Sequence, residues 1–132
     1  MSQCKTPNYN TFKAAGDLSS YQYHFVKFNG TATANDDTVT VADLGSNPVG
    51  ILMNAPSAAG DAALVACIGG GAKLLLGDTI GAGMMLKPDA SGHGVGGTAA
   101  GDFIGARALQ YGVVSDIIEV EVMGFTDHAG DA

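Results

Sequence analysis

Short apolar runs, separated by turns every ten or so residues, dominate the chain from residue 21 onward. The clearest run covers residues 117–123, in which Ile118, Val120 and Val122 alternate with polar positions. Successive side chains of a strand point to opposite faces, so this alternation predicts a strand with one buried face and one wet face.

Seven further runs predict strands of similar length. They occupy residues 21–28, 38–41, 49–53, 62–68, 73–76, 84–87 and 103–108. The segments between them are rich in glycine, asparagine, aspartate and proline, the residues that favour turns. About eight short strands with frequent turns predict an all-β domain, folded as a small barrel or sandwich.

The first 20 residues differ from the rest, because they are polar and follow neither a strand period nor a helix period. Only Tyr9, Phe12 and Leu18 offer spaced apolar anchors. We therefore expect residues 1–20 to form an extended N-terminal arm that contacts a neighbouring molecule through these three side chains. Residues 21–132 are then expected to form the single β-domain.

Charge excludes several partners. The chain carries 13 acidic and 6 basic residues, a formal net charge of −7, and the basic residues are scattered. Nucleic acid and anionic membranes both attract clustered Lys and Arg, so neither is an expected partner. No apolar run approaches the length of about 18 residues that a membrane helix needs. The start lacks the apolar stretch of a signal peptide, so we expect a reducing cytoplasm in which Cys4 and Cys67 are free thiols.

Candidate catalytic and binding motifs are weak. The triple glycine at 69–71 lacks the Gly-Lys-Ser/Thr of a phosphate loop. The three histidines, His24, His93 and His128, have no metal-ligand spacing. Ser57 does not lie in the Gly-x-Ser-x-Gly context of a nucleophile elbow. The prediction is a protein that is not an enzyme and that needs no metal or cofactor.

One ordered set of strand and turn motifs resembles a known family. The motifs are Val49-Gly50-Ile51, Gly77-Asp78-Thr79-Ile80-Gly81-Ala82-Gly83, Asp89-Ala90-Ser91-Gly92, Ile104-Gly105-Ala106-Arg107-Ala108-Leu109 and Ile118-Glu119-Val120-Glu121-Val122. In this order they resemble the small capsid cement, or head decoration, proteins of tailed bacteriophages. The resemblance covers roughly residues 45–124.

The resemblance implies a compact β-barrel on the outer surface of a virion, without catalytic activity. Its partner would be the major capsid protein, bound where neighbouring capsid subunits meet, and its role would be to stabilise the shell. We also expect a homo-oligomer, with a trimer favoured over a dimer, because a domain rich in glycine and poor in aromatic residues has a thin core. Met84, Met85 and Tyr111 are the predicted inter-subunit residues.

A second class of function stays open. Residues 77–86 resemble the Gly-Asp-x-Val-x-x-Gly-x-x-Leu hairpin of biotinyl and lipoyl carrier domains. Such domains need a modified lysine on a β-turn, whereas Lys73 precedes three leucines and Lys87 precedes a proline. Another small β interaction module is a further alternative, although a glycan-binding module would have only Tyr111 as an aromatic platform.

Overall fold

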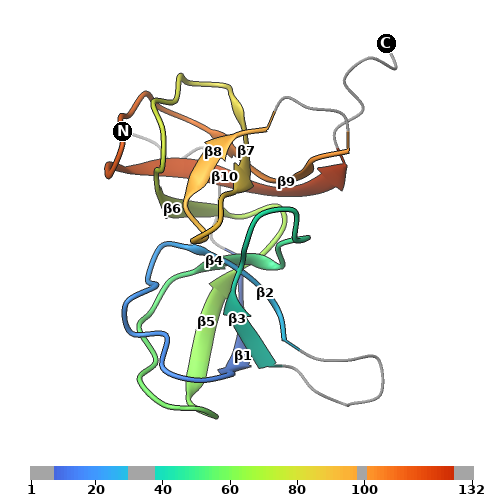
Figure 1. Cartoon of the computed structure of the whole chain (residues 1–132), viewed down its shortest axis with the longest axis vertical. Coiled ribbons are helices and arrows are strands. Elements are labelled where there is room, and N and C mark those ends of the chain that lie inside the picture. Colours follow the sequence, from blue (N-terminus) through green and yellow to red (C-terminus); the bar gives the residue numbers. More distant parts are fainter. Residues whose placement is uncertain (1–7, 30–37, 98–100, 127–132) are drawn as a thin grey trace.

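The computed structural model describes residues 8–29, 38–97 and 101–126, and these residues form ten strands and no helix (Figure 1). The strands are β1 (Tyr9–Ala14), β2 (Phe25–Phe28), β3 (Thr38–Val41), β4 (Gly50–Leu52), β5 (Ala62–Ala66), β6 (Gly71–Leu75), β7 (Met85–Pro88), β8 (Gly94–Gly96), β9 (Phe103–Ala108) and β10 (Ile117–Thr126). In the described part of the chain, no helix is long and apolar enough to cross a membrane.

The first five strands close into a small barrel in the order β1-β3-β2-β4-β5. β1 closes it, because it pairs antiparallel with β5 over Tyr9–Lys13 and parallel with β3 at Lys13 and Ala14. The barrel occupies the lower half of the view in Figure 1.

The remaining strands form a second sheet in the order β6-β10-β9-β7-β8, seen above the barrel in Figure 1. β10 lies between β6 and β9 and pairs antiparallel with both. An isolated parallel bridge joins Leu76, just after β6, to Gly94 in β8. The bridge connects the two edge strands at one end, so the sheet curls toward closure there.

Two apolar clusters hold the molecule together. The first fills the barrel and consists of Ala14, Leu18, Val26, Val39, Leu52, Ala63 and Val65. The second cluster lies between barrel and sheet, because it combines barrel residues such as Phe25 and Ile51 with sheet residues such as Leu86 and Val120. Barrel and sheet therefore share a core rather than touching only at their surfaces.

The sharing explains an unusual burial pattern in β2 and β4. Neighbouring residues of a strand point to opposite faces, yet Phe25 and Val26 are both fully buried, as are Ile51 and Leu52. In each pair, one side chain points into the barrel and the other into the cluster between barrel and sheet. At these two pairs of residues, β2 and β4 are therefore apolar on both faces.

The structure confirms the prediction of an all-β fold with a small barrel. Each of the eight predicted strands overlaps an observed one, and residues 38–41 and 103–108 coincide with β3 and β9. The predicted inward face of β10 is also confirmed, since Ile118, Val120 and Val122 are buried. Two strands, β1 and β8, were not predicted.

The structure corrects the prediction of a separate arm for the described part of residues 1–20. Tyr9–Ala14 form a strand of the barrel, and Leu18 is only 3% exposed within the barrel core. The boundary expected at residue 20 therefore divides a continuous structure. The sequence did not reveal this strand, because β1 is held in the barrel by backbone pairing while most of its side chains face solvent. Residues 1–7 lie outside the described part.

Candidate interaction surfaces

An exposed apolar patch lies on the connection between β9 and β10 and the start of β10. Tyr111, Val113, Val114 and Ile117 are 64%, 40%, 57% and 48% exposed. We call these four residues the β9–β10 patch. A group of large apolar side chains that stays in water is typical of a surface that another molecule covers.

The backbone beneath the β9–β10 patch is firmly held. Ile80 and Gly112 exchange two backbone hydrogen bonds of 2.8 and 3.0 Å, and the Ser115 amide donates to the Leu76 carbonyl at 2.9 Å. The Asp116 carboxylate accepts a hydrogen bond from the Val113 amide at 2.9 Å. Such a preorganised surface loses little conformational entropy when a partner binds.

A second apolar surface is a groove where the barrel meets the sheet. Its volume is about 390 Å³, and its lining residues come from both halves of the fold: Phe28, Asn47, Pro48, Val49, Ile68, Phe103 and Gly124. Phe28 and Ile68 are more than half exposed. The groove is therefore a concave surface suited to apolar contact.

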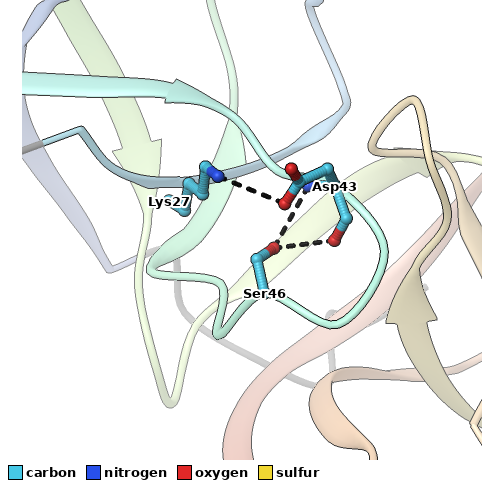
Figure 2. A network of polar contacts seen from close by, with 3 residues as sticks. All are labelled: Lys27, Asp43 and Ser46. Carbon is cyan, nitrogen blue, oxygen red and sulfur yellow. Dashed lines mark hydrogen bonds and ion pairs between the residues drawn. The ribbon is translucent and has the colours of Figure 1, made fainter.

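A polar network fixes the turn that follows β3 (Figure 2). Lys27 of β2 forms a 3.2 Å ion pair with Asp43. The Asp43 amide donates to the Ser46 hydroxyl at 3.1 Å, and that hydroxyl donates to the Asp43 carbonyl at 2.8 Å. The turn also carries the exposed side chain of Leu44.

The three residues predicted to contact a capsid or a neighbour lie in different environments. Tyr9 is exposed on β1, and Phe12 is half-buried with its ring edge-on to Phe28, at a centroid distance of 5.4 Å. Leu18 belongs to the barrel core. Its role as a contact residue is thus incompatible with its burial, whereas the contacts of Tyr9 and Phe12 stay predictions.

The predicted inter-subunit residues are also placed unequally. Tyr111 belongs to the β9–β10 patch, whereas Met84 packs against the core between barrel and sheet. The Met84 sulfur also accepts a hydrogen bond from the Gly81 amide at 3.1 Å. Met85 is half-buried in β7. Tyr111 is therefore the residue of this set that is best placed to contact another molecule.

Sequence patterns did not single out Val113, Val114 and Ile117. The first two lie in a loop, where strand periodicity gives no information about side-chain direction. The available signal was the pair of β-branched residues directly after Tyr111-Gly112, outside any predicted strand. Two adjacent valines in a turn are unusual, since turns favour polar residues and glycine.

The structure offers little for the carrier hypothesis. Lys13, Lys27, Lys73 and Lys87 all lie within strands, rather than at the hairpin turn that a carrier lysine occupies. Lys87 also forms an ion pair with Asp102 at 3.2 Å.

The described residues include histidine, cysteine and acidic side chains, which are potential metal ligands. Within the residues described, no group of three or more His, Cys, Asp or Glu side chains is arranged to hold a metal ion. Cys67 is a free, half-buried thiol, whereas Cys4 and His128 lie outside the described residues.

Comparison with known proteins found a likeness in fold but none in sequence family. No family model matches the sequence, and no curated protein matches it either. A solved structure does match: the N base of the head fiber gp8.5 in bacteriophage phi29, with a TM-score of 0.67 and 13% sequence identity. The alignment covers 87% of this chain and 92% of that one. At this identity the likeness shows a shared fold.

Proposed function

We propose that this chain is a virion structural protein that binds the outer surface of a phage capsid where major capsid subunits meet, and so stabilises the shell. The observation that carries the proposal is the likeness in fold to the base of the phi29 head fiber, which extends over 87% of the chain. A fold alone does not fix a function, so the proposal also needs a contact surface.

The β9–β10 patch is the surface that we assign to the capsid. Full burial of a large aliphatic side chain contributes about 1.5–3 kcal/mol, and these side chains are already partly covered. The patch would then contribute on the order of 4 kcal/mol per copy before the entropy of association is subtracted. Such modest binding becomes effective when many copies decorate one shell.

Self-association is a separate proposal. A homo-oligomer, with a trimer favoured over a dimer, would bury Tyr111 together with the exposed parts of Met84 and Met85 between copies, and would leave the three aliphatic residues of the patch to the capsid. Sedimentation of the free protein at micromolar concentration tests it. A monomer under these conditions contradicts the homo-oligomer and leaves the capsid role standing.

The test of the proposed function uses undecorated capsids of the phage that encodes this chain. The wild-type protein is expected to co-sediment with them. Val114→Asp places a charge at the most exposed aliphatic residue of the patch, and we expect it to weaken binding at least about tenfold, a loss of about 1.4 kcal/mol. Leu44→Asp is the matched control, because Leu44 is an aliphatic residue in a different turn and is exposed at least as much as Val114, 66% against 57%.

The outcomes test the capsid role and the assignment of the β9–β10 patch separately. If the wild-type protein stays in the supernatant, the proposed function is wrong. If Val114→Asp and Leu44→Asp bind as well as the wild type, the capsid role stands and the assignment of the patch is wrong. Both substitutions replace exposed side chains, so both variants are expected to melt within a few degrees of the wild type.

A further inference from the structure

Two histidines from distant parts of the chain meet between the barrel and the sheet. His24 directly precedes β2, and His93 lies in the turn between β7 and β8. Their ring centroids are 4.8 Å apart, and the planes of the rings are inclined by 44°. At this distance two protonated rings repel each other strongly, because little water separates them.

His24 is held in a position that favours its neutral form. The residue is only 6% exposed, its Nδ1 donates to the Gln22 carbonyl at 3.1 Å, and the Tyr21 ring packs edge-on against it. Burial lowers the pKa of His24 below its ordinary value. The bond to Gln22 opposes this shift, the positive charge of His93 adds to it, and the negative charge of Asp89 opposes it.

His93 has a carboxylate beside it. Its Nδ1 lies 3.3 Å from Asp89 Oδ2, while Asp89 Oδ1 accepts hydrogen bonds from the amides of Ser91 and His93 at 2.8 and 2.9 Å. Asp89 can thus face one imidazolium ring. Asp89 Oδ1 already accepts the two amide hydrogen bonds of the turn, so Asp89 offers no comparable contact to a second charged ring.

The other charged groups nearby are engaged elsewhere. Asp78, on the connection after β6, accepts a hydrogen bond from the Thr79 amide at 2.8 Å. Asp43, on the turn after β3, pairs with Lys27 (Figure 2). Tyr21 is the titratable residue that touches the His24 ring from its own segment. His93 and Asp89 are therefore the charges that act on His24.

The β7–β8 turn, which carries His93, contacts the barrel through its backbone. The Phe25 amide donates to the Gly92 carbonyl at 2.8 Å. Gly92 has a φ of +82°, and a Cβ atom there would lie 2.7 Å from Val41 Cγ2 and 3.0 Å from the Phe25 carbonyl oxygen. The β7–β8 turn therefore packs tightly against the barrel at Gly92. The turn cannot move away from β2 without breaking the hydrogen bond between Phe25 and Gly92.

We propose that the His24–His93 pair makes this docking acid-sensitive: protonation of both rings separates the β7–β8 turn from β2 and opens the Phe25–Gly92 hydrogen bond while the barrel stays folded. The direction follows from linkage. A histidine whose pKa is lowered in the folded state binds its proton more readily once its surroundings open. The docked form therefore loses stability as the pH falls below about 6.5, the ordinary value of the free side chain. This inference does not depend on the proposed function.

Amide hydrogen exchange, followed by NMR and corrected for the intrinsic rate, tests the proposal. We expect protection of the Phe25 amide to fall at least about tenfold between about pH 7.5 and about pH 5, a change of about 1.4 kcal/mol in the free energy of opening. The Met53 amide, bonded to the Leu64 carbonyl within the barrel, serves as the reference and should keep its protection. In His93→Gln, which removes the second charge but leaves His24 buried, the Phe25 amide should lose less protection at the lower pH than in the wild type.

Three results would overturn the proposal. They are unchanged protection of the Phe25 amide in the wild type, an equal loss in His93→Gln, and a parallel loss at Met53, which would indicate global acid unfolding. If His93→Gln does not fold, titration of the His24 ring in the wild type decides the matter. We expect the pKa of His24 to lie below its ordinary value, and a pKa at or above that value contradicts the proposal.

Discussion

Replacing Phe25 with alanine should separate the roles of two phenylalanines in one short strand. Phe25 is fully buried in the cluster that joins barrel and sheet. Loss of a buried phenylalanine side chain costs about 3–5 kcal/mol, because apolar contacts disappear and a cavity remains. For a chain of this length, about 4 °C of melting temperature corresponds to each kcal/mol, so Phe25→Ala should melt roughly 12–20 °C below the wild type.

Phe28→Ala is the matched control. Phe28 lies in the same strand but is 51% exposed, and its main aromatic contact is the ring of Phe12. We expect a loss of about 1 kcal/mol, or roughly 4 °C. Thermal unfolding followed by circular dichroism measures both variants. Equal shifts for the two variants would refute the account of a core shared by barrel and sheet, as would two separate transitions in the wild type.

Two further predictions concern the barrel backbone and one exposed carboxylate. Gly50→Ala should destabilise the protein by roughly 1–3 kcal/mol or prevent folding, because the new Cβ would lie 2.0 Å from the Ala66 carbonyl oxygen. In contrast, a Cβ atom in Gly16→Ala meets nothing within 4 Å, and this variant should be neutral or slightly stabilising; urea unfolding measures both glycine variants. Hydrogen bonds from the Ser19 hydroxyl and amide lower the pKa of Asp17 below 3.8, so a carboxyl titration by NMR should show its pKa rising in Ser19→Ala. No change in that variant would mean that the hydroxyl bond is not formed in solution.

The strands that were predicted are those whose side chains carry the burial pattern. β10 is the best example, because its buried residues alternate with glutamates along one strand. β1 was missed because its place depends on backbone pairing with β5, which leaves no apolar period in the sequence. β8 was missed because two of its three residues are glycines, whose pattern equally predicts a turn.

Neither the patch nor the histidine pair could be predicted in full from the sequence. Tyr111 was identified as a contact residue, but the direction of Val113 and Val114 depends on the hydrogen bonds that hold their loop. His24 and His93 lie in segments without any common motif, and they meet only because the β7–β8 turn docks on the barrel. Contacts between elements distant in the chain leave no local pattern in a single sequence.

Electron microscopy of virions tests the central claim most directly. The proposed function implies that a phage encodes this chain, and particles of that phage would be compared with particles from a mutant that lacks the chain. The account predicts difference density on the outer surface of the capsid, at junctions between major capsid subunits, with the size of this β-domain. Identical particles, or difference density inside the shell or on the tail, would contradict it.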